Sequence, residues 1–363
     1  MTVATDLQRN PWLDVCRGLA ILLVLLSHGR VFLRGEFPWT ELLRFGGFLG
    51  VELFFVLSGF LIGGILIRQA RSGTPHWLRV FYLRRWFRTL PNYYLFVLIN
   101  IGLVTLAIRP GDLSVVWQYL VFVQNLFWPH PLFFPEAWSL AVEEMFYLLF
   151  PALFLGLGRR LGLDSDRAIL VTACGVLVAS LLARVAVATG TEAWDEAIRK
   201  VAFLRFDTLM FGVLLAWLHA HGSPLLARRG WVWGAVALFV AAGGYFAVTP
   251  DPVLNQSLFA KTLYLSLASI GCAGLVIVGT GWRLPSLLAG PANLLARISY
   301  SAYLVNIPVA LTLVWLAEKG DNAALSPLAT WSVFMAATLV ISYVVYRWYE
   351  RFFNALRDRW FPA

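Results

Sequence analysis

Runs of about twenty apolar residues recur along the whole chain, and they constrain the fold more than any other feature. A helix of about that length crosses the hydrocarbon core of a bilayer, which is roughly 30 Å thick. Only 13% of the residues are charged, against about 25% in soluble domains. The sequence therefore predicts an all-α, polytopic transmembrane bundle. The expected spans are 12–33, 45–67, 90–108, 138–157, 168–188, 204–221, 231–248, 258–279, 298–316 and 328–347.

One further apolar stretch, 114–127, is too short to belong to this set. Its length of about 14 residues suits a re-entrant or interfacial helix better than a full span. No hydrophilic stretch is long enough to form a separate soluble domain. We therefore expect a single membrane domain that fills residues 1–363, with about ten transmembrane helices and one short additional helix.

The basic residues are distributed unevenly between the two sets of loops. Eighteen Lys and Arg residues fall on the side of the N-terminus and seven on the opposite side. The positive-inside rule places the richer side in the cytoplasm. This predicts a multi-pass protein of a bacterial cytoplasmic (inner) membrane, with the N-terminus and the C-terminus both cytoplasmic. The net charge of +9 is then explained by membrane topology, and no nucleic-acid partner is expected.

Charged side chains inside apolar spans are costly, so each one is a candidate functional residue. Arg17 and His28 both lie in the first span. Eleven residues of helix leave them only roughly 20° apart around the axis and roughly 16 Å apart along it. One helix face would therefore carry a cation near the cytoplasmic end and an imidazole in the outer half. The alternative is structural: an Asp14–Arg17 ion pair and a histidine hydrogen-bonded within the bundle.

Other spans carry further candidates of the same kind. Arg85 and Arg88 are three residues apart, so they share a helix face, and forked guanidiniums suit a phosphate-bearing ligand. A topology signal or contact with lipid headgroups is the alternative for these two arginines. In the second span, Ser58 and Gly59 are expected to serve close helix packing. Three carboxylates are also candidates: Glu52, and Glu143 and Glu144, which are next to each other in the sequence. Arg205 and Asp207 are expected to pair with each other or to bind substrate. Trp138 is an aromatic residue suited to a membrane interface. Three isolated cysteines without CxxC spacing predict no metal site.

Seven motifs resemble those of the acyltransferase-3 family of bacterial membrane acyltransferases, and they follow one another in the family's order. The resemblance covers Leu13 to about Phe353 and includes an arginine and a histidine separated by ten residues. One departure concerns Asn306, which stands where the family often has a histidine. The motifs are LDVCRGLAILLVLLSH, GVELFFVLSGFLIGG, RRWFRTLPNYY, WSLAVEEMFYLLFP, RFDTLMFGVLLA, ISYSAYLVNIPV and YRWYERFF.

The resemblance implies transfer of an acyl group, usually acetyl, from cytoplasmic acyl-coenzyme A to a hydroxyl of an extracytoplasmic glycan. Acyl-coenzyme A would be a donor substrate, with no tightly bound cofactor, and the other partners would be the glycan and membrane lipids. His28 would serve as a base or a transient acyl carrier. Glu143 or Glu52 would set its tautomer or steady its charge. The remaining assignments are Arg17, Arg85 and Arg88 for coenzyme A, and Arg205, Asp207, Trp138 and Asn306 for the acceptor.

A competing hypothesis is an ion-coupled transporter or an exporter of a glycan or lipid intermediate, in which the intramembrane charges would move protons or substrate. Such a protein is expected to contain paired repeats in its two halves. The sequence shows no convincing internal repeat.

Overall fold

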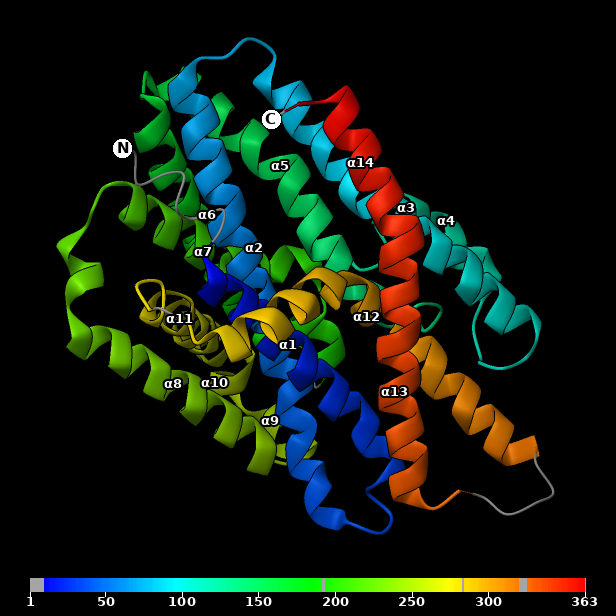
Figure 1. The fold of residues 1–363 in the computed structure, drawn as a ribbon. Coiled ribbons are helices and arrows are strands. Elements are labelled where there is room, and N and C mark those ends of the chain that lie inside the picture. Colours follow the sequence, from blue (N-terminus) through cyan, green and yellow to red (C-terminus); the bar gives the residue numbers. More distant parts are fainter. Residues whose placement is uncertain (1–9, 191–192, 283, 320–324, 363) are drawn as a thin grey trace.

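The computed structural model describes residues 10–190, 193–282, 284–319 and 325–362, and this part of the chain folds into a helical bundle (Figure 1). The α-helices in it are α1 (Pro11–Gly29), α2 (Arg44–Ser72), α3 (Trp77–Thr105), α4 (Val116–Leu120), α5 (Ala137–Leu161), α6 (Ser165–Ala188), α7 (Phe206–Ala220), α8 (Arg229–Val248), α9 (Asp251–Gln256), α10 (Leu258–Lys261), α11 (Leu263–Val278), α12 (Ser286–Lys319), α13 (Pro327–Val345) and α14 (Arg351–Trp360).

Each of the ten expected spans overlaps helical residues, and one of them, 258–279, is divided between α10 and α11. By length and composition, seven helical segments of the described chain can cross a membrane, and they include α1, α2, α5, α6, α8, α12 and α13. Two further apolar helices, α7 and α11, are shorter. Helix α3 is 29 residues long, but its first half is the arginine-rich segment. The prediction of an all-α polytopic bundle is confirmed.

The apolar stretch 114–127 contains only the five-residue helix α4, preceded by a single 3-10 turn at Leu113–Val115. Five residues rise about 7.5 Å, far less than the hydrocarbon core of a bilayer. The expected short, non-crossing helix is therefore confirmed.

Helix α1 packs against α2 on one side and α12 on the other, at the centre of the bundle (Figure 1). Helices α2 and α7 approach most closely where Gly59 faces Gly212. A Cβ atom on Gly59 would collide with the backbone of Leu209, and one on Gly212 would collide with the backbone of Val56. This close approach of two backbones at small residues is the packing expected of membrane helices.

The end of α2, the start of α3 and helix α14 lie together at one end of the molecule, at the top of Figure 1. Ion pairs connect elements there: Arg71 with Asp166 at 2.6 Å, and Arg84 with Asp358 at 3.1 Å. The loop before α2 and helix α9 lie at the opposite end. The arginine-rich segment of α3 thus belongs to the first of these ends.

Candidate functional site

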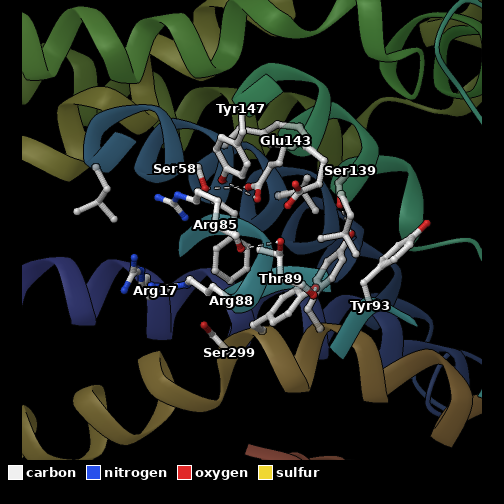
Figure 2. A pocket seen from close by; sticks show the side chains of 18 of the residues that line it. Arg17, Ser58, Arg85, Arg88, Thr89, Tyr93, Ser139, Glu143, Tyr147 and Ser299 are labelled. Atoms are coloured by element: carbon white, nitrogen blue, oxygen red, sulfur yellow. Dashed lines mark hydrogen bonds between the residues drawn. The ribbon is translucent and has the colours of Figure 1, made fainter. Parts of the chain in front are cut away.

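A cavity of about 110 Å³ lies between α1, α2, α3, α5 and α12, and we call it the arginine cavity (Figure 2). Arg17 reaches it from α1, and Arg85 and Arg88 reach it from α3. The two α3 arginines share a face because they are three residues apart. The guanidinium of Arg85 lies 4.9 Å from the ring centre of Tyr147.

The three arginines of this cavity form a concentrated positive charge. Among the described residues, none of the three has a carboxylate oxygen within ion-pair distance, although other arginines of the chain do. Guanidiniums that lack an acidic partner attract anions and bind phosphate through paired hydrogen bonds. The arginine cavity is therefore suited to the phosphates of a ligand.

Glu143 lies on the α5 wall of the same cavity (Figure 2). Its carboxylate accepts hydrogen bonds from the hydroxyl of Ser58 at 2.9 Å and from the hydroxyl of Tyr147 at 3.1 Å. Ser58 was expected to serve helix packing, so this hydrogen bond corrects that assignment. The placement puts Glu143 beside the arginines.

A second and larger cavity, of about 620 Å³, contains His28, and we call it the histidine cavity. Trp138 lies on its wall with only 5% of its surface exposed. Trp138 is therefore not the exposed interface residue that its sequence suggested, although its predicted contact with substrate remains open. The guanidinium of Arg199 lies 4.8 Å from the Trp138 ring centre. The charged residues that line this cavity with His28 are Arg30, Arg34, Glu41, Arg44, Glu136, Asp195, Glu196, Arg199, Lys200 and Asp251.

The imidazole of His28 is held by Asn306 of α12. Its Nδ1 lies 2.6 Å from the Oδ1 of Asn306. The amide nitrogen of Asn306 donates to the carbonyl oxygens of Ala302 and Tyr303, at 3.1 and 2.6 Å. The amide of Asn306 thus occupies the Nδ1 side of the ring, the place expected for Glu143 or Glu52, and the roles of these two carboxylates stay predictions.

Glu52 is instead a partner of Arg205, and both side chains are fully buried. The distance between the Arg205 Nη2 and the nearer Glu52 oxygen is 2.6 Å, and Thr208 joins the same network. Asp207 pairs with the buried Arg184 at 2.7 Å. None of Glu52, Arg205 and Asp207 lines either of the two cavities. The structure thus shows these three residues in ion pairs that join helices, and their expected contacts with His28 or with substrate stay predictions.

The two cavities border each other at Val51 and Tyr303, which line both. Arg17 lines one cavity and His28 the other, so one face of α1 addresses both, as the helical spacing predicted. The hydroxyls of Tyr303 and Ser139 lie 2.7 Å apart at this border. The two cavities are therefore neighbours inside the bundle, with Val51 and Tyr303 between them.

Several residues of the site were not among the candidates. Tyr303 and Tyr147 carry no charge, and the sequence gave no reason to separate them from other aromatic residues of the spans. Glu136 lies next to the span of α5 and was passed over in favour of Glu143 and Glu144. The feature that could have identified Glu136 is its position two residues before Trp138, just before the same span.

The fold and the two cavities define a multi-pass membrane protein in which a positively charged site and a histidine site approach each other inside the bundle. A family model described as an acyltransferase domain (acyltransferase 3) matches residues 10–347. The chain belongs to this acyltransferase family, and the resemblance noted in its motifs is confirmed.

Several curated relatives are similar to part of the chain. The peptidoglycan O-acetyltransferase OatA of Listeria monocytogenes is 32% identical over 162 residues, which is 40% of this chain and 24% of the relative. A Bacillus subtilis protein named "Putative peptidoglycan O-acetyltransferase YrhL" is 33% identical over 164 residues, or 41% of this chain and 24% of that protein. The match thus spans about a quarter of the length of each relative. No solved structure matches the chain.

Proposed function

We propose that this protein is an O-acyltransferase that moves an acetyl group from acetyl-coenzyme A, on the cytoplasmic side, to a hydroxyl of a surface or exported polysaccharide on the other side of the membrane. The observation that carries this proposal is the pair of cavities that border each other at Val51 and Tyr303. The family match and the O-acetyltransferase names of its relatives favour the same chemistry.

The donor would bind at the arginine cavity. Coenzyme A combines a phosphate-rich head with a long, thin arm that ends in the thioester. Arg17, Arg85 and Arg88 would hold the phosphates, and the arm would extend between the helices towards Val51 and Tyr303. The thioester would then reach the border with the histidine cavity while the head stays at the arginine-rich end.

The proposed orientation of the protein in the membrane rests on the position of the arginine cavity at the arginine-rich end. The arginine-rich end of the molecule would face the cytoplasm under the positive-inside rule, with the N-terminus and the C-terminus both on that side of a bacterial inner membrane. The histidine cavity would then open to the outside. Donor and acceptor would approach from opposite faces of the membrane and meet within it.

His28 would perform the chemistry at the border. In direct transfer, the acceptor hydroxyl oxygen bonds to the acetyl carbonyl carbon and the carbon–sulfur bond breaks. The imidazole takes the hydroxyl proton, and that proton then passes to the leaving thiolate. If the acetyl group rests on His28 first, Nε2 bonds to the acetyl carbon as the carbon–sulfur bond breaks and the thiolate leaves, because Nδ1 faces Asn306. The acceptor oxygen then bonds to the same carbon as the carbon–nitrogen bond breaks, and the hydroxyl proton passes through the freed imidazole to the thiolate.

The decisive experiment compares the O-acetyl content of surface polysaccharide from cells that have this gene, cells that lack it, and cells that carry a His28→Gln copy. We expect O-acetyl groups to disappear in the second and third strains. Unchanged O-acetyl content in the strain that lacks the gene would overturn the proposal. A transporter would leave acetyl-coenzyme A intact, so release of free coenzyme A by the purified protein in the presence of glycan separates the two hypotheses.

A further inference from the structure

Glu136 has a carboxyl group that the rest of the chain leaves without a partner. The residue directly precedes α5 and lines the histidine cavity, with 4% of its surface exposed. Both carboxyl oxygens are buried, and neither has a hydrogen-bond partner among the described residues. A buried carboxyl in this state is costly for a folded protein, and such groups normally find a donor.

The backbone carbonyl of Glu136 is anchored at the border between the two cavities. The hydroxyls of Ser139 and Tyr303 lie 3.3 and 3.2 Å from the carbonyl oxygen of Glu136. These are two of the residues at the border between the cavities. The residue is therefore anchored beside the point where the acyl group would be transferred.

The groups near Glu136 do not compensate for its burial. Burial raises the pKa of Glu136 to about 8, and its own backbone N–H and the more distant Arg109 offset only part of that rise. The guanidinium of Arg109 is already engaged, since its Nη1 donates to the Oδ1 of Asn100 at 2.6 Å. No other residue in the described part of the chain thus supplies a hydrogen bond to this carboxyl.

The other carboxylates that line the histidine cavity are all paired with basic residues. Glu41 lies 3.3 Å from Arg30, and Glu196 lies 2.6 Å from Lys200. Asp195 pairs with Arg199 and Lys200, and Asp251 pairs with Arg44. Among the carboxylates of the described residues that line this cavity, Glu136 is the one that has no such partner.

We infer that Glu136 binds the acceptor sugar, by accepting a hydrogen bond from a hydroxyl that lies next to the one being acetylated. The inference rests on the proposed function, which supplies the acceptor. A sugar with several free hydroxyls carries the donor hydrogens that a buried carboxyl lacks. Trp138, two residues further on, lines the same cavity. The inferred acceptor is therefore a sugar unit with at least two neighbouring free hydroxyls.

The test uses the full-length protein in detergent, with radiolabelled acetyl-coenzyme A and surface glycan extracted from cells that lack this gene. We expect Glu136→Leu to raise the KM for the glycan about ten- to a hundredfold, as loss of one hydrogen bond to a buried polar group predicts. The KM for acetyl-coenzyme A should stay within about twofold. Glu136→Gln keeps an acceptor oxygen and should recover most of the affinity for the glycan.

Thermal unfolding supplies a second readout. If Glu136 were needed only for folding, Glu136→Leu would lower the unfolding temperature. Removal of an unpartnered buried carboxyl should leave it unchanged or raise it. Glu36→Leu, which removes an exposed carboxyl outside the cavity, is the matched control and should change neither KM.

The outcomes separate this inference from the proposed function. If the unmodified protein transfers no acetyl group to the glycan, the proposed function fails. If it does, and Glu136→Leu leaves the KM for the glycan unchanged or lowers the unfolding temperature, the assignment of Glu136 to the acceptor site is wrong.

Discussion

The Nδ1 of His28 and the Oδ1 of Asn306 lie 2.6 Å apart, and this contact fixes the form of the imidazole. The amide nitrogen of Asn306 already donates to two backbone carbonyls, so its oxygen faces the ring as an acceptor. The Nδ1 of His28 must therefore carry the proton. In the neutral ring, Nε2 then has the free lone pair that a base or an acyl carrier needs.

The first prediction concerns His28 itself. His28→Gln should reduce acetyl transfer at least about a hundredfold, the low end of the contribution of a general base. Glutamine keeps hydrogen-bonding groups but cannot take up a proton at neutral pH. The measurement is transfer of radiolabelled acetyl to glycan by purified protein. Near-normal transfer by well-folded His28→Gln protein would remove His28 from the mechanism.

The second prediction concerns Asn306. Asn306→Leu should lower kcat about fivefold, because one neutral hydrogen bond contributes about 1 kcal/mol. Asn306→Asp keeps the acceptor and adds a negative charge that stabilises the protonated ring. Its pH–rate profile should therefore lose activity on the acidic side at a higher pH than that of the unmodified protein. Identical profiles for the two proteins would contradict the role given to Asn306.

The third prediction concerns the donor. Arg88→Ala should raise the KM for acetyl-coenzyme A roughly ten- to a hundredfold, since a charge-assisted hydrogen bond contributes about 1.5–3 kcal/mol. Arg71→Ala is the control, because Arg71 pairs with Asp166 away from the cavity. Equal and small effects of both substitutions would leave the arginines of α3 as topology signals.

The fourth prediction concerns membrane orientation. A single cysteine at Ser326, in the loop before α13, should react with a membrane-impermeant maleimide added to intact cells. A cysteine at Leu225, between α7 and α8, should react only after the membrane is opened. The background requires Cys174→Ser, because Cys174 is exposed. The reverse labelling pattern would invert the topology and place the histidine cavity on the cytoplasmic side.

The fifth prediction separates Glu52 from the catalytic group. Glu52→Gln leaves the buried Arg205 without its charged partner, and breaking such a pair costs about 3–5 kcal/mol. The unfolding temperature of the detergent-solubilised protein should therefore fall. The fraction that remains folded should keep its KM for acetyl-coenzyme A. A stable Glu52→Gln protein with strongly reduced kcat would restore Glu52 to the mechanism.

Hydrophobicity predicted the helices well because each span must be long and apolar enough to meet lipid. It failed at segments where helices continue beyond the membrane or break within it. Helix α12 begins at Ser286, twelve residues before the expected span, and α3 begins at Trp77 in a polar segment. The expected span 258–279 is divided between α10 and α11, where the buried Lys261 donates to the carbonyl of Ala188 at 3.0 Å.

The candidate site could be predicted only where one helix carries the information. The spacing of Arg17 and His28 placed them on one face of α1, and the two cavities use that face. Contacts between helices that are distant in the sequence could not be predicted, because hydropathy does not specify which helices become neighbours. Asn306 lies 278 residues from His28, and Arg205 lies 153 residues from Glu52.

The border formed by Val51 and Tyr303 also has a consequence for the cell that houses the protein. Under the proposed orientation the two cavities would enter from opposite faces of the membrane, and these two side chains would separate cytoplasm from exterior at this point. An opening wide enough for the thin arm of a donor must still exclude ions. A smaller residue at Tyr303 would turn the transferase into a leak that dissipates the proton gradient.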